Sequence, residues 1–413
     1  MSGESPSIVL SYEHAASVVR RQAERVRADG APARGVERVS LTESAGRVLA
    51  ESVVADRDQP PFARATRDGF ACRVADLGAG GLRVVGQLRA GEAWTLGAIR
   101  PGEAVEIMTG AAVPPGADCV VMVEHVAAAE GWVSLSAPRE LAPGENIVPA
   151  GAEAQAGDVV VPAGQRLGVA EIAAAAACGA AKLPVFARPR VAILATGDEL
   201  VDVTEKPQAH QIRNSNSYSL AQQARAAGAE PEVFPVVRDD EAATERAIRE
   251  ASSRDLVVLT GGVSMGKFDF VEQALLALGA EFFFTGARIQ PGKPVVFGRL
   301  TDTYFFGLPG NPISTMVTFA LFAAPLLRAM GGETDARPHF GMATVEEEVR
   351  VKAGLTRFLP ASIHTDVRGA RVRHIAWQGS GDLAAAAKAN GFLVVPETSE
   401  RVAAGEIVTV LEI

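Results

Sequence analysis

The sequence predicts a mixed α/β, multidomain protein whose largest unit is a doubly wound α/β domain. The chain has 413 residues, which is enough for about two to four domains of ordinary size. Strand and helix patterns alternate over residues 188–332, as in a parallel sheet with right-handed crossovers. Short β-like runs between glycines dominate residues 57–142, and a β-rich pattern returns after residue 333.

The parts before residue 188 combine helices with a small all-β module. Residues 11–29 have the spacing of an amphipathic helix that ends at Gly30, and "VERVSL" and "ESAGRVLAESV" predict a strand and a short helix. In the module, "LRVVGQL", "AVEIMTG" and "DCVVMVEHV" are the clearest strands. "APGENIVPAG" ends it, and the alanine-rich "GVAEIAAAAACGA" predicts a further helix.

From residue 188 onward, strands and helices take turns. The predicted strands are "RVAILATG", "PEVFPVV" and "LVVLTGG", and the predicted helices are "NSYSLAQQARAAG", "DEAATERAIREASS" and "DFVEQALLALG". A strand pair, "PVVFG" and "TYFFGLPG", leads into a long helix from Pro312. The remainder predicts a C-terminal β-barrel or sandwich with one short helix in "SGDLAAAAKANG".

Composition and charge argue against several classes of protein. A net charge of −9 without a run of Lys or Arg speaks against nucleic acid as a partner. Cys72, Cys119 and Cys178 form no CxxC pair, so we expect neither a zinc site nor disulfides, which fits a reducing cytoplasm. No signal-peptide pattern is visible at the N-terminus. "MVTFALFAAPLLRAM" is short and contains Pro325, which predicts a core helix rather than a membrane span.

Three glycine-bearing loops follow predicted strands of the α/β domain. They are "ATGDEL" (195–200), "TGGVSMGKFD" (260–269) and "LPGNPIS" (308–314). Ligands of open α/β sheets bind beyond the carboxyl ends of the strands, where glycine lets main-chain N–H groups point at an anion. A single loop of this kind is explained by turn formation alone. The set of three predicts a pocket for a phosphate-bearing molecule.

The second loop also fits the first part of a P-loop pattern. Counting from Gly261 gives G-x-x-x-x-G-K, with Gly266 and Lys267 in register. Phe268 stands where a P-loop has a magnesium-binding Ser or Thr, and the stretch follows the third strand rather than the first. We therefore expect a different anion-binding loop and a solvated Lys267.

Charged residues are expected around this pocket. The acidic ones are Asp198, Glu199, Asp239, Asp240 and Asp269. Carboxylates near a phosphate require a hard cation such as Mg²⁺ between them, although helix capping also explains aspartates at these positions. The turn in "ARIQPGKPVVFG" brings Arg288 and Lys293, and a cation held on such a turn suits an oxyanion. In the β module, "ATRDGFA" and "IMTGAAVPPGAD" are shaped by Gly and Pro, and turn chemistry explains most of them.

Taken in order, eight motifs resemble those of the molybdopterin molybdenumtransferases, the MoeA and gephyrin E-domain family of molybdenum cofactor biosynthesis. These are "DGFA", "IMTGAAVPPGAD", "LATGDEL", "IRNSNSY", "VRDD", "GGVSMGKFDF", "PGKP" and "LPGNPIS". The resemblance covers nearly the whole chain and implies an obligate homodimer with its site at the subunit interface. It implies four parts: a discontinuous, elongated helical segment (8–54 and 143–187), a β-rich insertion (55–142), an α/β molybdopterin-binding domain (188–332) and a C-terminal β-barrel (333–413).

The resemblance also implies a reaction. Molybdate would join the dithiolene of adenylylated molybdopterin, AMP would be released, and Mg²⁺ would be required. The substrates are anions, which agrees with loops rich in main-chain donors. The implied partners are a molybdopterin adenylyltransferase upstream and apo-molybdoenzymes downstream.

Motif matches assign roles to individual residues. The residues implied in catalysis are Asp68, Thr109, Glu199, Asp269 and Lys293. Those implied in binding are Thr196, Gly197, Asp198, Gly261, Gly262, Ser264, Pro309, Gly310, Asn311 and Ser314, with Ser314 and Lys293 on the molybdate side. Those implied as metal ligands are Asp239 or Asp240, together with Asp269. The chain departs from the family at Phe70, where a tyrosine is usual, and at Val148 and Leu355, where arginines are usual.

Two other functions remain compatible with the sequence. A molybdopterin-binding or carrier protein without insertase activity is one, since those arginines are missing. A hydrolase of another nucleotide or pterin phosphate is the other, since similar α/β domains occur in such enzymes.

Overall fold

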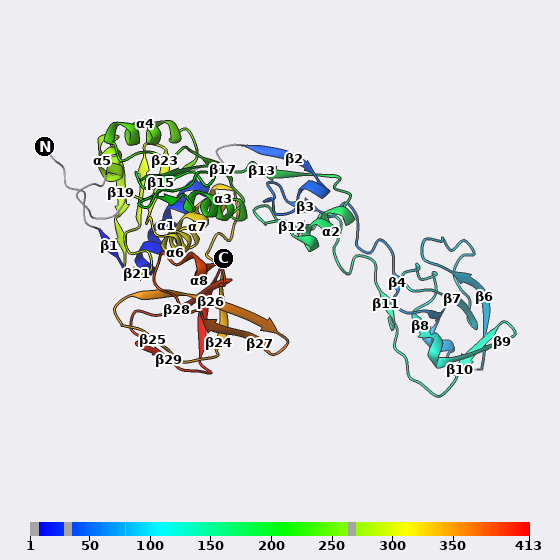
Figure 1. Cartoon of the computed structure of the whole chain (residues 1–413). Helices are drawn as coiled ribbons and strands as arrows, with labels where there is room; N and C mark the ends of the chain where they lie inside the picture. The colour runs from blue at the N-terminus through cyan, green and yellow to red at the C-terminus, as the bar shows by residue number, and fades with distance from the viewer. Residues whose placement is uncertain (1–7, 29–34, 79, 263–269) are drawn as a thin grey trace.

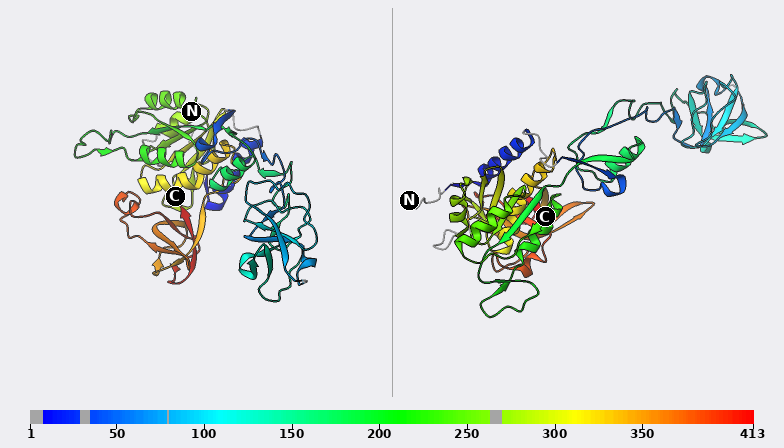
Figure 2. Two further views of the ribbon diagram at one scale, coloured as in Figure 1. Left: turned by 90° about the vertical axis from the view of Figure 1, so that its right-hand side faces the viewer. Right: turned by 90° about the horizontal axis from the view of Figure 1, so that it is seen from above.

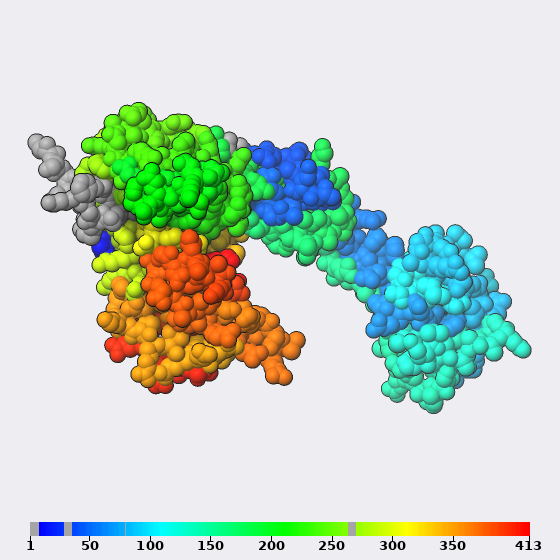
Figure 3. Space-filling view, viewed as in Figure 1, coloured from blue at the N-terminus to red at the C-terminus, as the bar shows by residue number. Residues whose placement is uncertain are grey.

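The structure is a computed structural model that describes residues 8–28, 35–78, 80–262 and 270–413. The chain is elongated, with a large α/β body, a β-rich part below it and a second β-rich part carried at a distance on a narrow arm (Figure 1). The space-filling view shows open space between the two β-rich parts (Figure 3). The arm therefore sets where the second β-rich part lies relative to the body.

A six-stranded sheet forms the middle of the α/β body. Its order is β17 (Glu230–Val233), β14 (Arg190–Ala195), β18 (Leu256–Thr260), β23 (Thr303–Leu308), β22 (Val296–Leu300) and β19 (Glu281–Phe284). The first four strands are parallel, whereas β22 and β19 are antiparallel to their neighbours. The predicted doubly wound domain and its strand pair are confirmed.

Helices cover both faces of this sheet. One face packs against α1 (Tyr12–Ala28), α3 (Asn216–Ala226), α6 (Pro312–Thr318) and α7 (Ala324–Met330). The other face packs against α4 (Glu241–Ala251) and α5 (Phe270–Ala277). Successive strand residues point to opposite faces, so that Val191 belongs to the first core and Ala192 to the second. Burial on both faces explains the continuous apolar runs of these strands.

The stretch from Pro312 to Met330 is helical throughout, with a π-helical segment (Phe319–Ala323) between α6 and α7. By length and composition this helix is able to cross a membrane, but 83% of an 18-residue stretch of it is buried inside the protein. It packs in the core that α1 and α3 share. The prediction of a core helix is confirmed.

The part carried on the arm is a six-stranded sheet. Its order is β8 (Cys119–Met122), β5 (Gly69–Cys72), β7 (Glu103–Ile107), β6 (Leu82–Leu88), β10 (Trp132–Leu135) and β9 (Val126–Ala129). The chain enters and leaves it through the neck, which we define as the antiparallel pair of β4 (Arg64–Ala65) and β11 (Ile147–Val148). Figure 2 shows this narrow connection from two further directions. The sheet has its own buried clusters on its two faces.

Between the neck and the α/β body lies a segment of two small sheets and one helix. The sheets pair β2 (Val36–Ser40) with β13 (Lys182–Phe186) and β3 (Val53–Val54) with β12 (Val159–Val161), and the helix is α2 (Val169–Ala177). The helix predicted from "ESAGRVLAESV" is wrong. A short 3₁₀ turn ends at Glu43, Gly46 adopts a φ of +71°, and Val48 and Leu49 form β-bridges. Pairing across chain segments has overridden local helix propensity there.

The C-terminal part is a closed five-stranded barrel. Around the ring, its strands are β26 (Thr356–Asp366), β27 (Gly369–His374), β24 (Phe340–Val345), β30 (Ile407–Glu412) and β28 (Gly391–Val395). The β26–β28 pairing closes the ring, which decides between the two predicted alternatives. Phe358, Phe392 and Leu411 join the core of the α/β body, so that the two parts pack together.

Candidate functional site

Three loops meet at the carboxyl edge of the central sheet, as the sequence predicted. They follow β14, β18 and β23, which are adjacent parallel strands. The Thr196 N–H donates to the Thr260 carbonyl at 3.0 Å, and the Gly261 N–H donates to the Leu308 carbonyl at 3.3 Å. These main-chain bonds tie the three strand ends together. The loops therefore begin from one continuous edge.

Gly261 shows why glycine is required here. Its φ of +88° is in the left-handed region, and a Cβ would lie 2.5 Å from the carbonyl oxygen of Thr196. A Cβ on Gly310, in the third loop, would lie 3.6 Å from the Gly261 Cα. The three backbones thus approach each other without side chains between them. In proteins, this geometry lets main-chain N–H groups converge on an anion.

Most of the binding residues expected on these loops lie at this edge. The described ones are Thr196, Gly197, Asp198, Gly261, Gly262, Pro309, Gly310, Asn311 and Ser314, and Glu199 of the implied catalytic set lies beside them. Thr196, Pro309 and Ser314 are buried, whereas Asp198, Glu199 and Asn311 are exposed. Ser264 and Asp269, with Lys267 and Phe268 of the P-loop pattern, lie outside the described residues.

Asn216 is a residue of this edge that our motif reasoning missed. It is 9% exposed at the start of α3, and its Nδ2 donates to Thr260 Oγ1 at 3.0 Å and to the Gly310 carbonyl at 2.7 Å. Because Thr260 Oγ1 donates its own proton to the Pro309 carbonyl, it can only accept from Asn216, as the Gly310 carbonyl also does. This fixes the amide orientation. The "NSNSY" stretch (214–218) at the start of α3 was the available signal in the sequence.

Two buried polar atoms at this edge lack a partner within the part of the chain that the structure describes. They are Asn216 Oδ1 and Thr196 Oγ1, and both have almost no solvent contact. A Cβ on Gly262 would lie 2.8 Å from Thr196 Oγ1, which places that hydroxyl against the second loop. Buried polar atoms are nearly always hydrogen-bonded in folded proteins. Two unpaired ones beside converging loops are typical of a ligand site.

The acidic residues divide into a facing pair and a helix cap. The Asp198 N–H donates to Asp239 Oδ2 and the Asp239 N–H donates to Asp198 Oδ1, both at 3.4 Å. Asp240 is the N-cap of α4, and its Oδ1 accepts from the Ala243 N–H at 2.7 Å. Among the described residues, no group of three or more His, Cys, Asp or Glu side chains could hold a metal ion. Two facing carboxylates still suit Mg²⁺, which takes few protein ligands beside waters and substrate phosphates.

The Pro-Gly-Lys-Pro turn packs on the helix that follows the third loop. A Cβ on Gly292 would lie 2.5 Å from Thr318 Cγ2 and 3.6 Å from the Ser314 carbonyl oxygen. Lys293 is exposed next to this contact, and its carbonyl accepts from the Ala287 and Val295 N–H groups. The turn is thereby fixed, while the ammonium group is free to reach solvent. The structure brings the turn bearing Lys293 beside the helix bearing Ser314.

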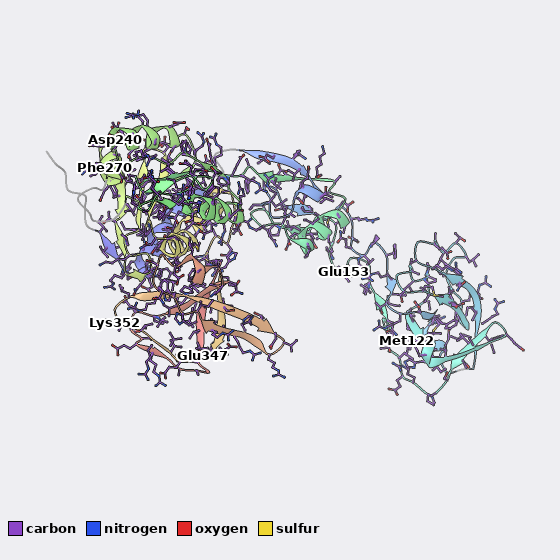
Figure 4. All side chains as sticks on the ribbon, viewed as in Figure 1. Met122, Glu153, Asp240, Phe270, Glu347 and Lys352 are labelled. Atoms are coloured by element: carbon purple, nitrogen blue, oxygen red, sulfur yellow. The ribbon has the colours of Figure 1, made fainter. Side chains whose placement is uncertain are left out.

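Asp68 and Thr109 contact each other, but at the far end of the molecule. Asp68 Oδ1 accepts from both the N–H and the hydroxyl of Thr109 at 2.6 Å. These two hydrogen bonds, the hydroxyl first, hold the pKa of the Asp68 carboxyl below its usual range. Met122, which pairs with Gly69 next to Asp68, lies in the part carried on the arm. Asp240 and Phe270 lie at the loop edge of the α/β body (Figure 4). One chain therefore does not bring all the implied catalytic residues together.

The three departures from the family pattern have different surroundings. Phe70 is buried in β5. Val148 lies in the neck opposite Arg64, which supplies a guanidinium on the partner strand. Arg357, two residues after Leu355, lies in β26 and donates to the Lys352 carbonyl at 2.7 and 2.9 Å. Guanidinium groups are thus present near both positions that lack the expected arginine.

Comparison with protein families finds matches along nearly the whole chain. Residues 10–179 match the MoeA N-terminal region (domain I and II), residues 192–329 match a probable molybdopterin-binding domain, and residues 343–413 match the MoeA C-terminal region (domain IV). Together these matches follow the order of parts seen in the structure.

Individual relatives agree with this. The chain is 35% identical over 393 residues to a molybdopterin molybdenumtransferase of Nostoc sp., covering 91% of this chain and 88% of that one. It is 34% identical to one of Bacillus subtilis, covering 91% and 89%. Among solved structures, two of a molybdopterin biosynthesis MoeA protein from Pyrococcus horikoshii resemble it with TM-scores of 0.80 and 0.71 at 28% and 32% identity. Each covers 98% of this chain and at least 99% of the other.

Proposed function

The chain belongs to the MoeA family of molybdopterin molybdenumtransferases, and on this premise we propose that it inserts molybdate into adenylylated molybdopterin and releases AMP in a magnesium-dependent reaction. As a transferase of molybdenum cofactor biosynthesis it handles only anionic substrates. The observation that carries the proposal is the convergence of three loops at one sheet edge, together with two buried polar atoms there that have no partner in the described residues. We further propose the four-part domain division and a cytoplasmic location, as the sequence analysis expects.

Each part of the site has a role in this proposal. N–H groups of the second and third loops, other than that of Gly261, which donates to the Leu308 carbonyl, would hold substrate phosphates, while Asn216 fixes the distance between the two loops. Lys293 and Ser314 would hold molybdate on the side of the Pro-Gly-Lys-Pro turn, where an ammonium group offsets the oxyanion charge. Preorganised donors of this kind act most strongly where charge develops during the reaction.

A magnesium ion fits the pair of Asp198 and Asp239 better than Asp240. Asp240 Oδ1 accepts from the α4 N-terminus at 2.7 Å, whereas the carboxylates of Asp198 and Asp239 make longer hydrogen bonds, at 3.4 Å, to each other's main-chain N–H beside the first loop. We propose that Asp198 and Asp239 hold the ion together with Asp269. When bound, Mg²⁺ would neutralise the phosphate charge that the carboxylates otherwise repel.

We propose that the working unit is a homodimer in which one subunit supplies Asp68 and Thr109 to the loops of the other. Within one chain, the arm holds these residues far from the loop edge (Figure 1). An ionised Asp68, kept so by Thr109, is suited to bind a cation. Upstream adenylyltransferase and downstream apo-molybdoenzymes would then meet this dimer.

The direct test is to incubate the purified chain with adenylylated molybdopterin, molybdate and Mg²⁺. We expect AMP release that stops when Mg²⁺ is chelated, and reconstitution of an apo-molybdoenzyme by the product. Tight pterin binding without AMP release would instead identify a carrier. AMP production from other nucleotides without pterin would identify a hydrolase.

The two-chain site has a separate test. Asp68→Ala and Lys293→Ala are each expected to abolish AMP release. Mixed dimers of the two variants retain one intact site, so random pairing restores about one quarter of the wild-type activity per chain. Asp68→Ala and Thr109→Ala are the matched control pair, because both changes affect the same half-site. If the first mixture stays as inactive as the control mixture, the site lies within one chain.

A further inference from the structure

A cavity of about 610 Å³ lies where the arm segment joins the α/β body, and we call it the junction cavity. Residues of β2 and of the β13–β14 connection line one side, and residues of α3 and β17 line the other. The body side includes Glu230, at the amino end of β17, so the cavity lies at the sheet edge opposite the three loops. Its volume is in the range typical of small-molecule sites.

Three arginines line the junction cavity, and among the described residues only the guanidinium of Arg47 has hydrogen-bond partners. Arg47 is largely buried and donates to Glu37 Oε2 at 2.7 Å and to the Phe186 carbonyl at 2.9 Å. Within the described part of the chain, neither Arg188 nor Arg225 has a hydrogen bond or ion pair from its guanidinium. Arg225 is in the last turn of α3, where a cation offsets the helix dipole. Arg188 lies in the connection between β13 and β14, and both Arg188 and Arg225 are exposed at the mouth of the cavity.

The surroundings of Arg188 are electropositive. Partial burial lowers the pKa of its guanidinium, and repulsion from Arg47 and Arg166 acts in the same direction. Glu37 and Glu230 act in the opposite direction; Glu37 is paired with Arg47, whereas Glu230, which also lines the cavity, forms no ion pair among the described residues. A guanidinium held near like charges without a partner carboxylate is the arrangement that oxyanion sites use.

We propose that the junction cavity binds a phosphate group. Arg188 and Arg225 would donate hydrogen bonds to it, and Arg47, held in place by Glu37 and the Phe186 carbonyl, would add a positive charge at the cavity lining. The planar guanidinium matches phosphate geometry, and two of them from different parts of the chain can hold one phosphate between them. The cavity has more volume than a free phosphate needs, so a small phosphorylated molecule also fits. Because its donors come from both sides of the junction, binding would hold the arm segment against the body.

This site is independent of the proposed insertase site. The two lie at opposite edges of the central sheet, separated by the length of strands of five or six residues, or roughly 17–20 Å. Loss of the junction site is therefore expected to leave AMP release intact at saturating substrate. The two proposals can fail separately.

Binding of pyrophosphate, inorganic phosphate and AMP to the full chain can be followed by isothermal titration calorimetry at constant ionic strength. We expect the double variant Arg188→Gln/Arg225→Gln to bind one equivalent fewer per chain than the wild type for at least one of these probes. Arg246→Gln, on the exposed face of α4, is the matched control, since Arg246 forms no ion pair among the described residues and the change in charge is of the same kind. It should bind like the wild type.

A second readout separates binding from folding. Removing Arg188 relieves repulsion from Arg47, whereas removing Arg225 takes away a cation that offsets the α3 dipole, so the melting temperature of the double variant without ligand should stay near that of the wild type. The probe that binds should raise the melting temperature of the wild type and of the Arg246→Gln control more than that of the double variant. If pyrophosphate, phosphate and AMP give the same stoichiometry and the same thermal shift in all three proteins, the junction cavity is not a phosphate site. If inorganic phosphate binds but AMP does not, the ligand is a free phosphate rather than a nucleotide.

Discussion

Asn216→Ala tests whether the start of α3 sets the geometry of the loops. The substitution removes the hydrogen bonds from Nδ2 to Thr260 Oγ1 and to the Gly310 carbonyl. Thr260 keeps its bond to Pro309, so one carbonyl, that of Gly310, loses its side-chain donor. Each net hydrogen bond is worth about 1 kcal/mol, and removing Asn216 Oδ1, which has no partner among the described residues, offsets part of the loss, so we expect a loss of about 1–2 kcal/mol. In a domain of this size that corresponds to a fall in Tm of roughly 2–8 °C.

The assay combines differential scanning fluorimetry with AMP release. The loss of activity should be greater than the loss of folded protein at the assay temperature, because the loop positions change as well as the stability. Asn216→Asp should be more damaging, since a carboxylate oxygen would face the Gly310 carbonyl and a buried charge without a partner costs about 3–5 kcal/mol. Asn390→Ala, which removes two side-chain hydrogen bonds in the barrel, is the control and should leave AMP release unchanged. A Tm and a rate of AMP release in Asn216→Ala equal to those of the wild type would refute the reasoning.

Three further predictions concern other parts of the molecule. Gly261→Ala should reduce Tm and AMP release for two reasons: left-handed backbone strain of about 1–2 kcal/mol, and a clash of the new Cβ with the Thr196 carbonyl. Gly279→Ala is the control, because Gly279 has a φ of +76° and open space around it, so only the backbone strain should lower its Tm. Burial lowers the pKa of His374 below its ordinary 6.5, so the unfolded chain binds a proton at this imidazole more readily than the folded chain does. The free energy of unfolding should therefore fall as the pH drops below 6.5. In His374→Gln, Tm should depend less on pH over this range. Glu333→Gln should lower Tm by removing the charge of the 2.6 Å pair with Arg166, at a cost of about 1.5–3 kcal/mol, because Arg166 keeps the Gly46 and Ala227 carbonyls as acceptors. An unchanged Tm would show that this charge contributes nothing.

Much of the α/β body could be predicted from the sequence because local and long-range signals agree there. The runs "RVAILATG" and "LVVLTGG" are apolar throughout, as strands buried on both faces must be, and the structure shows β14 and β18 side by side. Parallel pairing then places the loops after them at one edge. The three-loop edge was therefore predictable from the strand order alone.

Other features depend on contacts that sequence patterns do not report. The short helix predicted near Gly46 is replaced by bridges from Val48 and Leu49 to residues more than a hundred positions away. Asn216 was missed because its role depends on the exact positions of Thr260 and Gly310, which lie far apart in the sequence. The junction cavity was invisible for the same reason, since Arg47 and Arg188 approach each other through the pairing of Leu49 and of β2 with β13.

The neck has a consequence for how this protein can be remodelled. Entry and exit strands of the projecting sheet, β4 and β11, run side by side, so the two cut points of the module are neighbours in space. A module with adjoining ends can be exchanged as a cassette, with its own buried clusters intact and the central sheet untouched. Chimeras that graft this cassette from a relative would show whether it carries its part of the proposed two-chain site with it.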